Sequence, residues 1–190
     1  MNHNKLIQHI GKYVELNDSE IPLLEKKVRV VNLKKNEYLL KEGQVCKSLY
    51  FVEKGCLRMF FVHKKATEQV TQFAIENWWL SDYFSFTDRI PTDYCIQSIE
   101  KSEILAIDNT VFETLLKEIP PLEKYFRIIM QKAVIASQHR AKLQYQMSKE
   151  EFYQHFVTSF PEFNQRVPQY MIASYLGLTP EYVSELRKKR

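Results

Sequence analysis

The sequence predicts an α+β protein in which a jelly-roll-like antiparallel β-roll is followed by one long helix and an all-α helix-turn-helix unit. Three observations support this order. Short β-rich runs recur between positions 28 and 108, about 26 residues without glycine or proline follow a pair of prolines, and the last two dozen residues fit two helices joined by a turn. We therefore expect three parts, residues 1–118, 119–147 and 148–190.

Composition and charge narrow the class of protein. The 190 residues include 45% hydrophobic and 13% aromatic residues, enough for a folded core, while the net charge of +4 is too small to argue for nucleic-acid binding by itself. No run of about 18 apolar residues occurs, and the N-terminal segment lacks the apolar stretch of a signal peptide. We expect a cytoplasmic protein with no membrane contact.

The cysteines and histidines form no metal-binding pattern. Cys46, Cys56 and Cys95 are an odd number without CxxC spacing in apolar stretches, which predicts reduced, buried thiols. The histidines, scattered without an HxH pair, are His3, His9, His63, His139 and His155. We expect no metal and no cofactor. Because no GxSxG, P-loop or GxGxxG motif occurs, we also expect no enzyme activity.

The N-terminal part begins with helical periodicity and then changes to strands. Apolar residues at helical spacing predict short helices in the first 35 residues, with Asp18 or Ser19 as a cap ahead of Pro22. The predicted strands are VRVVNL, EYLLKEG, SLYFVEKG, CLRMFFVHK, EQVTQFAI, WWLSDYF, DYCIQSI and EILAID. Eight such runs, with Gly43 and Gly55 between them, are typical of an antiparallel roll.

A long helix is predicted after Pro120 and Pro121, preceded by a helix over VFETLLKEI that Asn109 or Thr110 can cap. Its 4-3 seam comprises Leu122, Phe126, Ile129, Ala133, Ala136, Arg140, Leu143 and Met147. A seam sustained for more than three heptads favours a symmetric two-helix dimer interface; packing on the chain's own domain is the alternative. Arg140 departs from the apolar pattern, and it either sets the register of the pair or contacts a ligand.

Helix-boundary residues divide the C-terminal part. Ser148 and Glu151 form a capping box that opens a helix over KEEFYQHFVTSF, which Pro161 ends. Pro168 suits the first position of the next helix, because a proline lacks the amide hydrogen that would be unpaired there.

From residue 169 the sequence QYMIASYLGLTPEYVSELRKK fits a helix-turn-helix. Ala173 is small where the two helices meet, and Gly177 can end the first helix in the left-handed conformation. Thr179 can cap the second helix, with Pro180 at its first position. An ordinary helical hairpin is the alternative.

The second helix of this motif would enter the major groove of DNA, with its first two turns toward base edges. Glu181 and Glu185 could accept hydrogen bonds from cytosine, and Ser184 could donate or accept one. The chain ends in four consecutive cations, which suit phosphate contacts. The predicted phosphate contacts are Gln169, Thr179, Arg187, Lys188 and Lys189, and Pro180 completes the predicted DNA-binding set.

This order of parts resembles the Crp/Fnr family of transcription regulators. In the most specific stretch, LLKEGQVCKSLYFVEKGCLRMFF, Gly43 and Gly55 bracket LYFV as the family's paired turn glycines bracket its strand. The segment VPQYMIASYLGLTPEYVSELRKK looks like the variant common in the Bacteroidetes branch. The resemblance implies a cyclic-nucleotide-binding-like effector domain, a homodimer on palindromic double-stranded DNA and RNA polymerase as a further partner.

The resemblance also implies an effector pocket, formed by Trp79, Leu80, Ser81, Asp82, Arg89, Asp93 and Tyr94. Family members that bind cyclic nucleotides use a Gly-Glu pair for the ribose and an Arg followed by Ser or Thr for the phosphate. Ser81-Asp82 and Asp93-Tyr94 stand at those places here. An acidic residue in the phosphate clamp would repel the ligand, so we expect no cyclic AMP binding. Because Arg89 could supply a cation nearby, an unidentified anionic effector is one alternative. An empty pocket is the other.

Other effectors and functions fit the residues less well. An iron-sulfur sensor needs an N-terminal cysteine cluster, which is missing before Cys46, and a haem sensor needs more than the isolated His63. A β-roll also hosts cupin-type metal enzymes, but these need clustered ligands. The alternative that remains is a sensor module that signals to a protein partner, which would dimerise without being retained on DNA.

Overall fold

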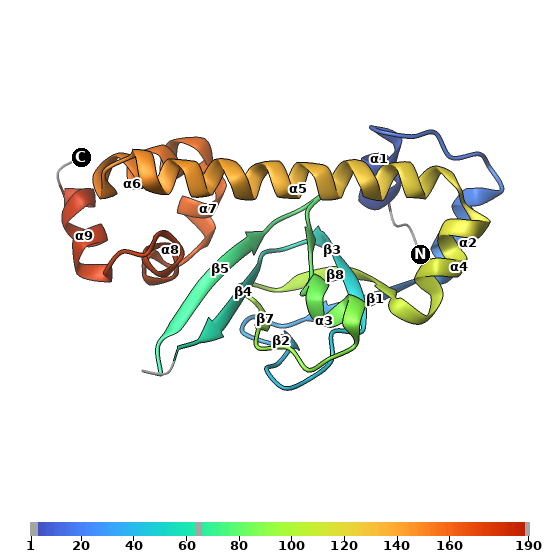
Figure 1. Cartoon of the computed structure of the whole chain (residues 1–190), viewed down its shortest axis with the longest axis horizontal. Helices are drawn as coiled ribbons and strands as arrows, with labels where there is room; N and C mark the ends of the chain where they lie inside the picture. The colour runs from blue at the N-terminus through green and yellow to red at the C-terminus, as the bar shows by residue number, and fades with distance from the viewer. Residues whose placement is uncertain (1–3, 64–65, 189–190) are drawn as a thin grey trace.

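The computed structural model describes residues 4–63 and 66–188 (Figure 1). Two four-stranded antiparallel sheets form the β-roll, with strand orders β1-β8-β3-β6 and β2-β7-β4-β5. The strands are β1 (Val28–Leu33), β2 (Tyr38–Leu40), β3 (Ser48–Lys54), β4 (Leu57–Val62), β5 (Glu68–Ala74), β6 (Trp79–Leu80), β7 (Cys95–Ser98) and β8 (Ser102–Asp108). The predicted antiparallel roll is therefore confirmed.

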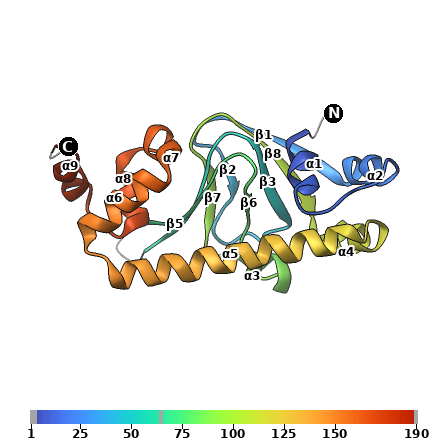
Figure 2. The same ribbon diagram turned by 90° about the horizontal axis from the view of Figure 1, so that it is seen from above.

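One long helix, α5 (Pro121–Gln146), lies beside the roll, and shorter helices lie at both of its ends (Figure 2). Figure 2 shows the roll beside α5, with the N-terminal helices at one end of α5 and the C-terminal helices at the other. The other helices are α1 (Asn4–Gly11), α2 (Glu20–Lys27), α3 (Tyr83–Asp88), α4 (Asn109–Glu118), α6 (Lys149–Ser159), α7 (Pro161–Arg166), α8 (Gln169–Leu176) and α9 (Pro180–Lys188).

The structure corrects one predicted strand. The run WWLSDYF forms only the two-residue strand β6 before the chain enters α3. The cause is Asp82, whose carboxylate accepts hydrogen bonds from the amides of Phe84 and Ser85 and so caps α3. An N-cap of this kind satisfies amides that would otherwise lack partners, and here it outweighs the strand preference of the aromatic residues.

Several helix boundaries also differ from the predicted ones. Ser19 stands at the N-cap of α2, as one of the two predicted residues, but its side chain makes no capping bond. The side-chain oxygen of Asn17 instead accepts from the amides of Ser19 and Glu20. Asp108, rather than Asn109 or Thr110, precedes α4. Pro161 ends α6 as predicted but also begins α7, which the sequence did not predict, and Pro168 precedes α8 instead of opening it.

Two hydrophobic cores hold the chain together. The first draws on both sheets, the N-terminal helices and the start of α5; Phe51, Leu105 and Tyr125 are completely buried in it. The second joins the β-roll to the C-terminal helices, with Phe73 of β5 and Phe156 of α6 in one cluster. Because burying each such side chain contributes about 1.5–3 kcal/mol, the second core attaches the C-terminal helices firmly to the roll.

No helix in the described part of the chain is both long and apolar enough to cross a membrane.

Candidate nucleic-acid interface and effector pocket

Helices α8 and α9 form the helix-turn-helix. Gly177 ends α8 in the left-handed conformation, with φ 69° and ψ 30°, and its amide donates to the carbonyls of Ala173 and Ser174. The hydroxyl oxygen of Thr179 accepts a hydrogen bond from the Tyr182 amide at 3.2 Å and so caps α9. The turn residues thus have the conformations and contacts that the sequence predicted.

The inner faces of the two helices are packed, while the outer face of α9 is free. Ile172, Ala173, Val183 and Leu186 are almost completely buried, so α8 and α9 pack together as one unit. The exposed residues of the turn and of α9 include Thr179, Pro180, Glu181, Ser184, Glu185, Arg187 and Lys188. Helix α9 lies at the end of the molecule farthest from the N-terminal helices, where a second macromolecule can approach it (Figures 1 and 2).

One predicted DNA contact, Gln169, does not join this exposed set. The side chain of Gln169 is half-buried, its amide nitrogen donates to Asn164 Oδ1, and its Oε1 atom is buried. This arrangement makes Gln169 a poorer phosphate donor than the sequence predicted. Lys189 lies outside the described residues.

Helix α8 docks on β5, an edge strand of the roll. The Ser174 hydroxyl accepts from the Val70 amide at 2.9 Å and donates to the Glu68 carbonyl at 2.8 Å. The Gln69 side-chain amide also donates to the Ser174 carbonyl. These bonds satisfy edge-strand groups that would otherwise face solvent, and they join the helix-turn-helix to the roll.

Arg140 of α5 completes this joint. Its guanidinium donates to the Thr71 carbonyl of β5 at 2.8 Å and to the Tyr175 carbonyl of α8 at 2.6 Å. The same group lies over the Tyr175 ring, 3.7 Å from its centroid. Arg140 therefore links three elements of its own chain.

A second polar contact between the roll and the C-terminal helices is centred on Arg166 of α7. It bonds Glu76 at 2.8 Å and Glu100 at 2.5 Å. Burial alone would raise the pKa of Glu76, but the hydrogen bonds from Arg166 and from the Gly55 amide together lower that pKa to about 2. Glu76 is therefore ionised at neutral pH, and the ion pair stays intact.

The structure corrects the predicted dimer seam at the two ends of α5. Leu122 and Phe126 are buried in the first core and Ile129 packs against it, while Leu143 and Met147 pack against the second core. The alternative considered from the sequence, packing on the chain's own domains, holds for these residues. Of the remaining predicted seam residues, Ala133 and Ala136 are exposed, and Arg140 belongs to the joint described above.

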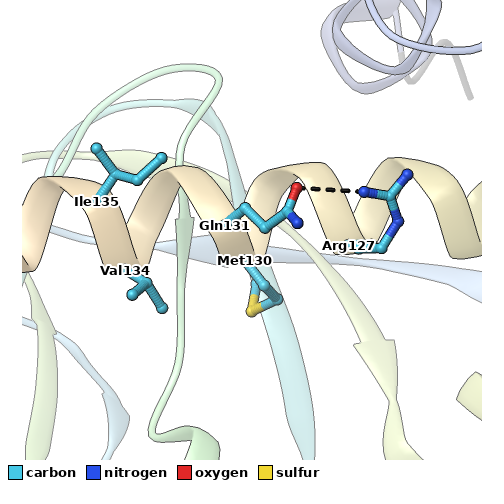
Figure 3. A pocket seen from close by; sticks show the side chains of 5 residues that line it. All are labelled: Arg127, Met130, Gln131, Val134 and Ile135. Carbon is cyan, nitrogen blue, oxygen red and sulfur yellow. Dashed lines mark hydrogen bonds between the residues drawn. The ribbon is translucent and has the colours of Figure 1, made fainter.

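The opposite face of α5 carries exposed apolar side chains. Val134 is 57% exposed and Ile135 is 63% exposed, and both line a shallow hollow with Met130, Arg127 and Gln131 (Figure 3). Arg127 donates to the Gln131 side chain at 3.2 Å along one edge of this hollow. We call this surface the outer face of α5. Tyr145, eleven residues beyond Val134 on the same helix, is 94% exposed.

A hydrogen-bond network centred on Asp82 lies among the predicted effector-pocket residues. The Asp82 carboxylate is buried; besides capping α3 it accepts a hydrogen bond from the Thr92 hydroxyl at 2.5 Å. The Thr92 oxygen in turn accepts from the Tyr94 amide at 3.0 Å. The Ser85 hydroxyl donates to the Ile90 carbonyl and accepts from the Cys46 amide. These bonds tie α3 to the segment before β7.

The other predicted pocket residues are spread over different environments. Ser81 is buried beside Asp82, where its hydroxyl accepts from the Tyr50 amide, and Leu80 belongs to the first core. Trp79 donates to the Tyr125 hydroxyl at 2.8 Å. The predicted residues Arg89 and Asp93 are exposed, and Arg89 donates to Asn109. The structure therefore brings Ser81, Asp82 and the Tyr94 backbone together, and sequence reasoning missed Ser85 and Thr92.

The three cysteines are free and buried, as predicted. Burial raises the pKa of the Cys46 thiol and raises that of Cys56 to about 12, which keeps both protonated and unreactive at neutral pH. Within residues 4–63 and 66–188, no three side chains of the kinds that bind metal ions come together.

Comparison with known proteins agrees with this architecture. Residues 30–119 match the family model of the cyclic nucleotide-binding domain. Over 186 residues the chain is 26% identical to the fumarate and nitrate reduction regulatory protein of Vibrio cholerae, covering 90% of this chain and 72% of that protein. It is 24% identical over 185 residues to the electron transport regulator A of Shewanella oneidensis, with the same two coverages.

Solved structures share the fold at lower identity. A Crp/Fnr-family regulator from Eubacterium rectale gives a TM-score of 0.70 at 15% identity, over 92% of this chain and 83% of that chain. The global regulator CLP of Xanthomonas campestris gives 0.70 at 15% identity, over 91% of each chain.

The chain has a roll of the cyclic-nucleotide-binding type, then a long helix and then a helix-turn-helix, and its relatives are regulators. These features define a DNA-binding transcription regulator rather than an enzyme. The chain is similar in sequence to the fumarate and nitrate reduction regulatory protein and in fold to a regulator of the Crp/Fnr family.

Proposed function

We propose that this regulator binds double-stranded DNA through the exposed face of α9. The main support is the structure of α9, a capped helix whose inner residues are buried. Its outer face presents Glu181, Ser184 and Glu185. These side chains suit base edges in the major groove, and the exposed cations Arg187 and Lys188 suit phosphates. Because α9 lies at the end of the molecule, the rest of the chain leaves the groove-facing side open (Figure 1).

The proposed regulator acts as a homodimer that pairs through the outer face of α5. Every residue from 131 to 139 is exposed in the single chain, so the middle of this helix lacks cover on all sides. Exposure of the side chains of Val134, Ile135 and Tyr145 to water is energetically unfavourable. This strip therefore favours pairing with a second copy of the chain. A two-fold pair would place two α9 helices on the half-sites of a palindrome, about 34–36 Å apart.

Two substitutions in α9 test the proposed DNA contacts. Glu181→Ala should relax base choice at one position of the site and leave the salt dependence near that of the unchanged protein, because only a base contact is lost. Lys188→Ala should weaken binding to all sequences and lower the slope of log K against log salt by about one unit, because one phosphate contact is lost. Both would be titrated at several salt concentrations against a duplex selected by the unchanged protein and against a scrambled duplex.

The outcomes separate specific recognition from general attraction. Identical behaviour of the two variants would contradict the assignment of separate roles. If the unchanged protein selects no duplex from a randomised pool but still dimerises, the proposed DNA-binding function is wrong and the sensor-module alternative gains support.

The proposed regulator does not use cyclic AMP as its effector. The acceptor atoms of Asp82 are already engaged by Thr92 and by the amides of α3, so a ribose has no free carboxylate to bind. Arg89, the nearest predicted cation, is engaged with Asn109 at the surface. These contacts support a roll whose pocket is closed by its own side chains.

Adding cyclic AMP is therefore expected to leave the melting temperature of the protein unchanged. A ligand present at 100 times its Kd stabilises the folded state by about 2.7 kcal/mol, which a thermal-shift assay readily detects. The selected DNA duplex serves as the positive control for stabilisation by a ligand. A rise in melting temperature with millimolar cyclic AMP, absent with AMP, would show that the pocket opens.

A further inference from the structure

We propose that Arg140 is a positioning residue that sets the orientation of the recognition helix α9 relative to the dimer axis; this inference rests on the proposed DNA binding as a dimer. Arg140 is bonded to none of the predicted DNA contacts within the described residues. It acts through α8, because its guanidinium holds the Tyr175 carbonyl at the C-terminal end of that helix and stacks on the Tyr175 ring.

The covalent connection alone leaves this orientation weakly defined. Helix α5 ends at Met147, which has the extended backbone angles φ −99° and ψ 147°, and α6 begins after the capping residue Ser148. A non-helical break of two residues allows the C-terminal helices to rotate about the end of α5. Noncovalent contacts must therefore fix the angle between α5 and the helix-turn-helix.

Arg140 is suited to fix that angle because it is part of α5 itself. Leu143 and Met147 of α5 also pack against the second core, but apolar packing is not directional. The other hydrogen-bonded contacts described above, from Ser174 to β5 and from Arg166 to Glu76 and Glu100, hold the C-terminal helices to the roll. Arg140 alone in that set joins α5, β5 and α8 at one group, with planar donors aimed at two carbonyls. A guanidinium of this kind defines direction as well as distance.

The orientation of α8 is transmitted to α9. Leu178 of the turn donates its amide to the Ala173 carbonyl of α8, and Val183 and Leu186 are buried between the helices. In a dimer, a rotation at each joint changes the separation of the two α9 helices. A change of about 3.4 Å in that separation corresponds to one base pair along the DNA.

Half-site spacing is therefore the measurement that tests the proposal. A palindromic duplex selected from a randomised pool by the unchanged protein would be rebuilt with its central spacer shortened or lengthened by one and two base pairs. Arg140→Gln should bind the original spacing more weakly and lose most of its preference over the altered ones, a fall in selectivity of about 5-fold or more. Base preference within each half-site should stay unchanged, because α9 itself is intact.

Lys142→Gln is the matched control, since it removes one exposed positive charge from the same helix. It should keep the spacing preference of the unchanged protein. Arg140→Lys keeps the charge but cannot bridge two carbonyls and stack on a ring, so it should also broaden the spacing preference, and it replaces the glutamine variant if that variant does not fold. Melting temperatures of all variants report folding.

Two results would overturn the proposal while leaving DNA binding intact. One is uniform weakening by Arg140→Gln and Arg140→Lys at all spacings with the preference retained, which would mean a structural role only. The other is tighter binding at all spacings, which would mean that the joint holds α9 away from DNA. If the unchanged protein itself binds no duplex, the failure lies with the proposed function instead.

Discussion

Val134→Asp is expected to convert the proposed dimer to a monomer and raise its dissociation constant by about 100-fold or more. The substitution places two carboxylates face to face on the outer face of α5, where pairing would remove them from water without a partner of opposite charge. Because Val134 is 57% exposed in the single chain, the fold itself should tolerate the change. Sedimentation velocity over a range of protein concentrations measures the effect directly.

The same variant should lose affinity for a palindromic duplex by about 100-fold, because two half-site contacts no longer act together. Affinity for a single half-site should stay the same, since α9 is unchanged. This contrast distinguishes loss of pairing from damage to the helix-turn-helix.

Ala136→Asp is the matched control, and it also tests the seam predicted from the sequence. Ala136 is exposed and belongs to that predicted seam, and it lies about 200° around the helix from Val134. Both variants put the same charge into the bare middle of α5. We expect Ala136→Asp to remain dimeric. A monomeric Ala136→Asp together with a dimeric Val134→Asp would restore the original seam and contradict the outer face.

Local patterns in the sequence predicted local structure well. The capping box of Ser148 and Glu151 is present as predicted, and so are the left-handed Gly177 and the Thr179 cap. Each of these features depends on residues within a few positions of one another, so the residues that cause it are visible together. The same reason explains why α5 was predicted almost to the residue.

The sequence could not show whether α5 packs against a partner helix or against the core of its own chain. A 4-3 repeat tells which residues share one face of a helix, but a partner helix and the chain's own core satisfy that face equally well. In the structure the two ends of the repeat pack against the two cores, and the pairing surface proposed here is less apolar because it includes Arg127 and Gln131. The more regular apolar pattern belonged to the intramolecular contact.

Contacts between distant positions account for the remaining differences. Arg140 reaches Thr71 and Tyr175 across 69 and 35 positions, and Ser174 reaches Glu68 across 106. Neither short-range periodicity nor a motif reports such pairs. One clue was present, since a cation interrupting an apolar repeat requires hydrogen-bond acceptors nearby when it is half-buried.

Gly55→Ala is expected to destabilise the protein by about 3 kcal/mol or more. Gly55 joins β3 to β4 with φ +109°, a conformation that residues with a side chain rarely adopt. An added Cβ would lie 2.5 Å from Ser102 Cβ and 2.7 Å from Ser102 Cα, and because Cα is backbone it cannot swing away. Urea unfolding, followed by far-UV circular dichroism, measures the loss.

The position of Gly55 extends the damage to the second core. Its amide donates to Glu76 at 2.8 Å, and Glu76 in turn binds Arg166 of α7. A displaced Gly55 backbone therefore weakens the attachment of the C-terminal helices as well as the crossing between the two sheets. The ring of Trp78 contacts Phe163 of α7. We therefore expect the fluorescence of Trp78 to change at a lower urea concentration than the circular dichroism signal does.

Gly43→Ala isolates the steric part of this effect. Gly43 also has positive φ, +82°, but an added Cβ there would meet no atom within 4 Å. Backbone strain alone should cost about 1 kcal/mol at this site. The difference between the two variants then reports the overlap with Ser102. Equal and small losses for both would mean that β8 yields at Ser102 and that the close approach of Gly55 is not needed for the roll to close.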